Sequence, residues 1–194
     1  MNDNLSVTRA NKTKQKIIDA AVILITEKGF TATTIRDICT TADVSIGAFY
    51  HHFENKQALV ASGFLMFDKT LNESLQTLSQ DPLIALTELL IIQTKFIADN
   101  ASGLITQYYI SLLSDEKKCA VSVERRYYQY VLAKAKLAKE QNLVKPEFSA
   151  EYLTDFFIKF VRGCLVDWCL HNRNYDIVES VQNELQFLIA NVKK

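Results

Sequence analysis

The sequence predicts an all-α protein of about nine helices, in which an N-terminal three-helix domain precedes a larger helical domain. Glycine and proline are scarce, at 5 and 2 of 194 residues, whereas a β-rich chain of this length needs many turns built on such residues. Apolar side chains recur at helical spacing along most of the chain, and no segment alternates with the period of two typical of strands. The hydrophobic share of 48% allows a sizeable core.

The first predicted helix covers residues 12–28, with its apolar positions on one face and its charges on the other. These apolar positions are Ile17, Ile18, Ala21, Leu24 and Ile25. Lys28 lies in the last turn, where a cation complements the helix dipole, and Gly29 is the residue type expected just past a helix end.

The second and third predicted helices are short and separated by a tight turn. Thr34, followed three residues later by Asp37, matches a variant of the capping box that opens a helix. Asp43 then interrupts this helix, because aspartate tolerates the left-handed conformation of a tight turn, though less well than glycine. Ser45 is predicted to cap the third helix, which ends near Phe53.

Six further helices are predicted in the rest of the chain. Pro82 suits a first helical turn after Asp81, and Ser149 suits a helix cap. The approximate ranges are 56–79, 82–100, 102–115, 120–141, 149–172 and 175–191.

The third helix has two chemically different faces. Phe49 and Phe53 are four residues apart and are predicted to face the core together with Val44. The opposite face carries Ile46, Gly47, Tyr50 and His51, with His52 near its edge. A glycine in a helix costs about 0.5–1 kcal/mol relative to alanine, so the close approach of a partner would explain Gly47. Two short helices braced by a longer one form a helix-turn-helix, whose second short helix enters the major groove of DNA.

These residues resemble the N-terminal pattern of the TetR (tetracycline-repressor) family of bacterial transcriptional regulators. The matching positions are Thr34, Ile38, Ala42, Val44, Ser45, Gly47, Tyr50, His52, Phe53, Lys56 and Leu59. The spacing holds over about 25 residues. The sequence departs from the family pattern at Asp43, where glycine is usual, and at Cys39, where alanine is usual.

The resemblance implies a role for each matching residue. Tyr50, His52 and Lys56 correspond to positions that contact phosphate, Thr34 to a cap that faces phosphate, and Arg36 to a position that reaches a base edge. Ile46, Gly47 and Ala48 correspond to variable reading positions, where small apolar groups favour thymine methyl contacts and shape readout. The full predicted DNA-binding set is Thr34, Arg36, Ser45, Ile46, Gly47, Ala48, Tyr50, His51, His52 and Lys56.

The resemblance further implies a DNA-binding domain at residues 1–55 and an effector-binding and dimerisation domain at residues 56–194. In such a regulator the last two long helices pair with their copies to form a homodimer. Aromatic and polar side chains of the second domain are candidates for a small-molecule site that takes an apolar or aromatic effector. The candidates are Phe64, Phe67, Phe96, Gln107, Tyr108, Tyr127, Phe160 and Trp168. For each aromatic residue among them, a place in the core is the simpler reading.

Several other classes of protein are not favoured. No nucleophile with a base, phosphate-binding loop or carboxylate pair has the spacing that an enzyme needs, and no cofactor is expected. The adjacent His51 and His52 point about 100° apart on a helix, which does not suit a metal site. No apolar run reaches the ~18 residues that cross a membrane, and the first 14 residues lack a secretory pattern, so a cytoplasmic location is expected.

Two functional hypotheses therefore remain. The first is a dimeric, ligand-responsive regulator, most simply a repressor, that binds a palindromic operator in double-stranded DNA. The second is a helical ligand-binding protein of the same fold without specific DNA activity. Residues 1–60 contain seven basic and six acidic residues, which lends slight support to the second hypothesis. The intact contact face, and a basic stretch at Arg9, Lys12, Lys14 and Lys16, favour the first, although that stretch also fits a solvated tail.

Overall fold

The computed structural model describes residues 2–65, 67, 71, 75–101, 103–114 and 121–194. Within these ranges the regular elements are helices, apart from one isolated bridge between Val144 and Lys193, which confirms the all-α class. The chain divides into two compact units. The first comprises Met1–Phe64 and Asn100–Glu116, and the second comprises Leu65–Asp99 and Lys117–Lys194. The functional boundary after residue 55 stays a prediction.

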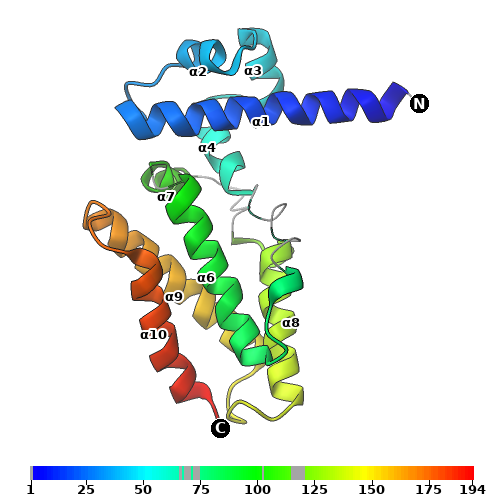
Figure 1. The fold of residues 1–194 in the computed structure, drawn as a ribbon, viewed down its shortest axis with the longest axis vertical. Helices are drawn as coiled ribbons and strands as arrows, with labels where there is room; N and C mark the ends of the chain where they lie inside the picture. Colours follow the sequence, from blue (N-terminus) through cyan, green and yellow to red (C-terminus); the bar gives the residue numbers. More distant parts are fainter. Residues whose placement is uncertain (1, 66, 68–70, 72–74, 102, 115–120) are drawn as a thin grey trace. The chain divides into compact units, whose positions relative to one another are not determined.

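The first unit is built on a long N-terminal helix. It contains α1 (Asn2–Lys28), α2 (Ile35–Ala42), α3 (Ile46–His52), α4 (Lys56–Leu65) and α7 (Ile105–Ser114). Helices α2 and α3 lie side by side and both pack against α1 (Figure 1). Helix α1 begins ten residues earlier than predicted, because residues 2–11 contain no glycine or proline to interrupt it.

The core of this unit comes from the apolar faces that the helical spacing predicts. Phe49 is completely buried and Phe53 nearly so, as expected for the inward face of α3. Burying one such side chain stabilises the fold by about 1.5–3 kcal/mol, which fixes α3 on its neighbours. The other buried residues of α1–α4 include Ile17, Ile18, Ala21, Ile25, Ile38, Cys39, Ala42, Leu59 and Val60.

The turns of the first unit follow the predicted local chemistry. Gly29 ends α1 with a φ of 82°, and Asp43 ends α2 in the left-handed region at φ 54°. Thr34 and Asp37 form the capping box in both directions. The Ser45 hydroxyl accepts a hydrogen bond from the Ala48 amide at 3.1 Å, so it caps α3 as predicted.

The second unit contains four long helices, of which α6 enters the first unit with its last two residues. These are α6 (Pro82–Ala101), α8 (Arg126–Glu140), α9 (Ala150–Leu170) and α10 (Ile177–Val192). Helix α9 packs against both α8 and α10 (Figure 1). Ser149 caps α9 as predicted, Pro82 opens α6 as predicted, and Asp81 and Asp176 cap α6 and α10.

Two predicted helices differ from the observed ones because polar side chains compete for backbone groups. The last residues of the helix predicted at 56–79 are not α-helical. Leu75–Thr77 form a 3-10 turn, and the Ser79 amide donates to the Glu88 side chain. The range 120–141 becomes helical only at Arg126, because the Ser122 hydroxyl accepts from the Glu124 amide and forms a local turn.

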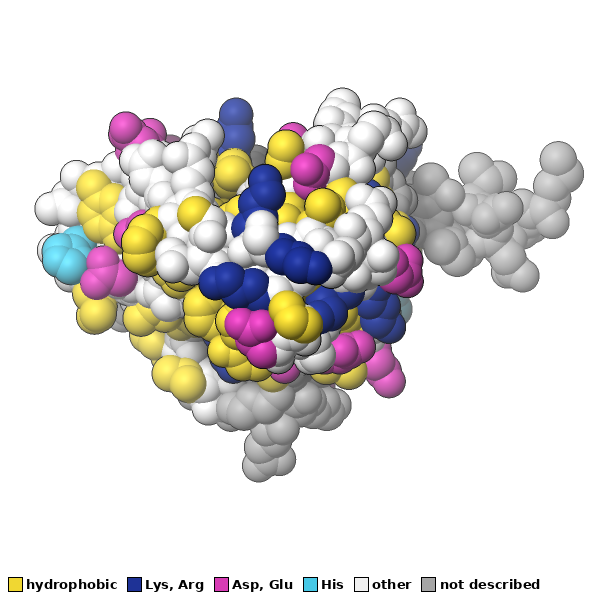
Figure 2. Space-filling model, turned by 90° about the horizontal axis from the view of Figure 1, so that it is seen from below, with side chains coloured by type: hydrophobic (Ala, Val, Ile, Leu, Met, Phe, Trp, Pro, Cys, Tyr) yellow, Lys and Arg dark blue, Asp and Glu magenta, His cyan; other side chains and the backbone are white. Residues whose placement is uncertain are grey.

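The chain ends beside the loop that joins α8 to α9. The Lys145 amide donates to the Val192 carbonyl and the Lys194 amide to the Leu143 carbonyl, each at 3.0 Å. Figure 2 shows the protein from below, with lysine and arginine side chains near the middle of the face. Near the chain end, the Lys139 and Lys145 ammonium groups donate to the main-chain oxygens of Pro146 and Asn191, and that of Lys194 donates to the Asn142 side chain. Among the described helices, none is both long and apolar enough to span a bilayer.

Candidate functional site

The outward face of α3 is exposed and carries the residues predicted to read DNA. Ile46 is 45% exposed and Tyr50 55% exposed, although both are large and apolar or aromatic. A Cβ atom added at Gly47 would meet only the Ser45 hydroxyl oxygen, at 3.8 Å, so the surrounding chain does not require glycine there. An exposed glycine between these residues leaves space for a partner to approach the α3 backbone.

The start of α2 forms a second part of this face. The Lys28 ammonium lies 2.7 Å from an Asp37 carboxylate oxygen, which also accepts the Thr34 amide at 3.0 Å. The hydrogen bond from Lys28, followed by those from Thr34, lowers the pKa of Asp37 to about 2. Thr34 is therefore held in its capping geometry, and the Arg36 side chain beside it is exposed.

The end of α3 carries a small cluster of basic groups. The rings of His51 and His52 lie 5.0 Å apart in an edge-to-face arrangement. The Lys14 ammonium of α1 lies 5.4 Å from the centre of the Phe53 ring. Burial, then the nearby His51 and Lys14, lowers the pKa of His52, so the neutral imidazole is favoured in the free protein. An approaching phosphate would favour the charged form.

Lys56, predicted to contact phosphate, has protein partners instead. Its ammonium donates to the carbonyl oxygens of Phe30 and Thr33, the latter at 2.6 Å, and lies 4.1 Å from the centre of the Phe30 ring. Burial lowers the pKa of Lys56. The phosphate contact of Lys56 stays a prediction, and its position in the free protein is set by the loop between α1 and α2.

The predicted effector residues fall into separate groups. Phe67 lies 5.2 Å from Phe96 and 5.4 Å from Tyr127 between ring centres, forming a buried aromatic cluster in the second unit. Phe67 and Tyr127 are each at most 3% exposed. This cluster is core packing that an apolar ligand could also use.

The other predicted effector residues do not join this cluster. Gln107 and Tyr108 lie on α7 in the first unit. The Trp168 indole donates to the Tyr175 carbonyl at 2.9 Å, which ties the end of α9 to the turn before α10. The side chain of Phe64 lies outside the described part of the structure.

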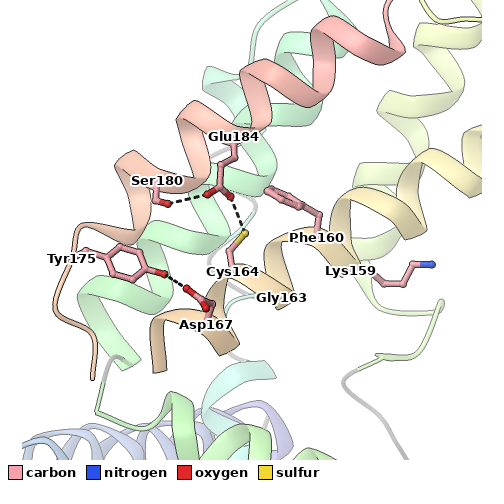
Figure 3. A pocket seen from close by; sticks show the side chains of 8 residues that line it. All are labelled: Lys159, Phe160, Gly163, Cys164, Asp167, Tyr175, Ser180 and Glu184. Atoms are coloured by element: carbon pink, nitrogen blue, oxygen red, sulfur yellow. Dashed lines mark hydrogen bonds between the residues drawn. The ribbon is translucent and has the colours of Figure 1, made fainter. Parts of the chain in front are cut away.

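A groove of about 600 Å³ runs between α9 and α10, and Phe160 lines it (Figure 3). The Cys164 thiol lies 3.3 Å from a Glu184 carboxylate oxygen, and the Tyr175 hydroxyl donates to Asp167 at 3.1 Å. Burial and the Glu184 carboxylate raise the pKa of Cys164 to about 12, so the thiol stays protonated. In the described ranges, no three histidine, cysteine or carboxylate side chains gather as a metal site would require.

Sequence reasoning missed two residues that shape the surface predicted to face DNA. Thr33 is completely buried, and its hydroxyl donates to the carbonyl oxygens of Gly29 and Leu24 at 2.8 and 3.3 Å. Phe30 lies under the Lys56 ammonium. In the sequence, the hint of a role for Thr33 is that it stands directly before Thr34. The capping pattern explains Thr34 but leaves Thr33 unexplained.

Comparison with known proteins agrees with this architecture. The family model described as "Bacterial regulatory proteins, tetR family" matches residues 17–62, which cover the second half of α1, all of α2 and α3 and the start of α4. Over these residues the chain is therefore similar to the TetR family. This confirms the resemblance read from the sequence.

Individual TetR-family relatives match different shares of the chain. The probable acrEF/envCD operon repressor of Escherichia coli (strain K12) is 37% identical over 94 residues, covering 46% of this chain and 42% of that protein. This match therefore spans less than half of the relative's length. The transposon Tn10 TetC protein of Escherichia coli is 26% identical over 178 residues, covering 89% of this chain and 86% of that protein.

The fold also matches a solved structure of a transcriptional regulator. The transcriptional regulator FadR from Bacillus subtilis, solved in complex with stearoyl-CoA, superimposes with a TM-score of 0.72. The match covers 90% of this chain and 96% of that one, at 19% sequence identity. At this level of identity the likeness concerns the fold.

Proposed function

We propose that this protein is a TetR-family DNA-binding repressor that a small apolar ligand releases from its operator. One observation carries the proposal. Helix α3 presents Gly47 and Tyr50 outward: the surrounding chain does not require glycine at 47, and Tyr50 stays 55% exposed although its ring meets the Phe49 ring. Phe49 and Phe53 hold the helix from behind. A helix exposed in this way fits a DNA major groove, which is roughly 12 Å wide.

DNA contact is proposed to combine phosphate anchoring with shape readout. Tyr50, His52 and Thr34 would bind backbone oxygens, and the Arg36 side chain would reach a base edge. Ile46, Gly47 and Ala48, together with Ser45 and His51, would line the groove. Because the reading positions are small or apolar, thymine methyl groups and groove geometry would carry most of the sequence preference.

The test is selection of duplex fragments from the source genome by the full-length protein. The expected result is a recurring palindromic site whose affinity falls steeply with salt, as phosphate contacts require. If every duplex binds no better than random DNA, the chain is instead the helical ligand-binding protein without specific DNA activity.

The effector is proposed to contact the aromatic cluster of Phe67, Phe96 and Tyr127. A FadR of this fold was solved with stearoyl-CoA, which makes long-chain acyl thioesters the first compounds to test. The expected result is weaker operator binding and a change in Trp168 fluorescence, both reduced in Phe96→Leu. A compound that binds the protein without altering its operator affinity would contradict the proposal that the effector releases the protein from DNA.

We further propose that α9 and α10 pair with their copies in a homodimer. Gly163 sits on the exposed side of α9 beside the groove, and a Cβ atom there would meet nothing within 4 Å. Large apolar side chains on these helices are also exposed, notably Leu170 at 75% and Phe187 at 70%. A second copy would cover this face, and two α3 helices roughly 34–36 Å apart would read a palindrome.

A further inference from the structure

We propose that Lys159 of one subunit forms an ion pair with Glu184 of the partner subunit, so that the exposed face of α9 and α10 selects a second copy of this chain. This inference rests on the proposed homodimer and adds the contact that chooses the partner. In a two-fold interface the same patch of each subunit meets the other, so the ion pair would occur twice.

Glu184 lies in the groove between α9 and α10, and the contacts that it makes there leave its charge uncompensated (Figure 3). Its carboxylate accepts hydrogen bonds from the Cys164 thiol and the Ser180 hydroxyl, each at 3.3 Å. Both donors are neutral, since burial and Glu184 itself raise the pKa of Cys164 to about 12. Among the residues that the structure describes, Glu184 belongs to no ion pair, and its side chain is exposed.

Lys159 supplies the opposite charge on the same face. It lines the groove together with Glu184, but its side chain points away from that carboxylate (Figure 3). Lys159 is also exposed and belongs to no ion pair within the described ranges. A face that carries separate charges of both signs can match its own copy, whereas a face of one sign would repel it.

Asp167, the other carboxylate of the groove, has a basic group of its own subunit beside it. Its carboxylate lies 3.3 Å from a ring nitrogen of His171 and accepts the Tyr175 hydroxyl at 3.1 Å. The structure therefore favours Glu184 over Asp167 as the group that receives a cation from a second copy.

The apolar surroundings explain why this ion pair would control association. Phe160 lines the groove, and Phe187, three residues after Glu184 on α10, is 70% exposed. A Cβ atom at Gly163, one turn after Lys159, would meet nothing within 4 Å, which leaves room for the partner. An ion pair in water adds little, but one that apolar groups cover is strengthened as water leaves. A charge covered without its partner opposes association.

The test is an exchange of charges between two chains. Lys159→Glu and Glu184→Lys each place like charges opposite one another, so either variant alone should raise the dimer dissociation constant about tenfold or more. When the two variants are mixed, every contact of the heterodimer again joins opposite charges, and its dissociation constant should return close to that of the natural protein. Native mass spectrometry of differently tagged chains measures the heterodimer fraction, and analytical ultracentrifugation gives the dissociation constants.

Asp167→Lys is the matched control, because it reverses another exposed carboxylate of the same groove. Its mixture with Lys159→Glu should stay dissociated. Rescue of Lys159→Glu by Asp167→Lys would overturn the choice of Glu184. A mixture of Lys159→Glu and Glu184→Lys that associates no more tightly than either variant alone would overturn the ion pair.

A double-mutant cycle of Lys159→Met and Glu184→Gln keeps the proposal testable if Glu184→Lys does not fold. The double variant should dimerise about as well as either single variant, whereas independent, additive effects would overturn the ion pair. A natural protein that stays monomeric at every concentration would overturn the homodimer and the ion pair together. A natural dimer that tolerates both charge reversals would overturn the ion pair alone.

Discussion

Lys28 and Asp37 form an ion pair, with 2.7 Å between the ammonium and the carboxylate, at the point where α1 ends and α2 begins. The same carboxylate accepts the Thr34 amide and so completes the cap of α2. One side chain thus joins two helices and holds the first residue predicted to meet DNA.

Removing this carboxylate is expected to lower stability in a pH-dependent way. The folded-state pKa of Asp37 is lowered from 3.8 to about 2, so its contribution is fully present above about pH 4. It is lost as pH falls from about 4 to 2. Thermal unfolding of Asp37→Asn should therefore lie below that of the natural protein at pH 7, and the difference should vanish near pH 2.

Glu54→Gln is the control for this measurement, because Glu54 is also an exposed carboxylate beside α3. Its substitution should leave the pH dependence of the melting temperature unchanged. A constant difference between Asp37→Asn and the natural protein across this pH range would contradict the role of the ion pair and cap.

Asp43 occupies a backbone conformation that glycine adopts more easily. Its φ of 54° and ψ of 53° lie in the left-handed region. We expect Asp43→Gly to raise stability by up to about 1 kcal/mol and Asp43→Val to lower it by about 1–2 kcal/mol. For a chain of this size, 1 kcal/mol corresponds to roughly 2–4 °C in melting temperature, which calorimetry resolves.

Asn142 provides a matched site in the second unit, with a φ of 57°. Asparagine tolerates this conformation better than most residues, so Asn142→Gly should change the melting temperature less than the substitution to valine at either site. Equal melting temperatures for Asp43→Val and the natural protein would show that the turn can adopt another conformation.

Operator affinity is expected to rise as pH falls from about 8 to 6. The pKa of His52 is lowered from 6.5 in the free protein, so the neutral ring is favoured until phosphate stabilises the charged form. Binding then takes up a proton, which gives up to about a tenfold change in affinity per pH unit. The stability of the free protein should move in the opposite direction, declining as pH falls through about 6.5.

The test is to measure operator affinity against pH at constant salt. The His52→Gln variant should lose most of the pH dependence of its affinity. His171→Gln is the control, because His171 lies at the end of α9 in the second unit. An identical pH dependence in His52→Gln and the natural protein would remove His52 from the phosphate contacts.

Gly163→Leu is expected to separate the stability of the subunit from that of the dimer. Glycine in a helix is about 1 kcal/mol less favourable than alanine, and space around Gly163 is open, so the subunit itself should not be destabilised. A bulky side chain at a close helix contact costs about 1–3 kcal/mol, so the dimer dissociation constant should rise about tenfold or more.

Analytical ultracentrifugation over a concentration series gives the dissociation constant. Ala133→Leu adds a similar side chain at an exposed site on α8 and should leave it unchanged. If Gly163→Leu leaves the dimer dissociation constant unchanged, the contact between the two subunits lies away from this part of α9.

The sequence predicted the first unit accurately where the determining interactions are local. The caps at Thr34 and Ser45, the left-handed Asp43 and the burial of Phe49 and Phe53 all depend on contacts within about one helical turn. Periodicity and capping rules describe interactions of this range, and they also carried the family resemblance.

The predicted helix ends were wrong where a polar side chain accepts a hydrogen bond from a backbone amide. Ser122 delays the start of α8, and the hydrogen bond from the Ser79 amide to Glu88 accompanies the end of helical structure before α6. Apolar spacing continues through both segments, so the helical pattern alone extended them too far.

By itself, then, the sequence determined the helical class, the positions of most helices and the two faces of α3, because each follows from neighbours along the chain. Only the tertiary structure decided which distant groups the long side chains contact. It turned the Lys56 ammonium toward the carbonyl oxygens of Phe30 and Thr33, and it gathered Phe67, Phe96 and Tyr127 while leaving Gln107 in the other unit. These partners are brought together by the packing of helices, and helical periodicity fixes which face is buried without fixing what it is buried against.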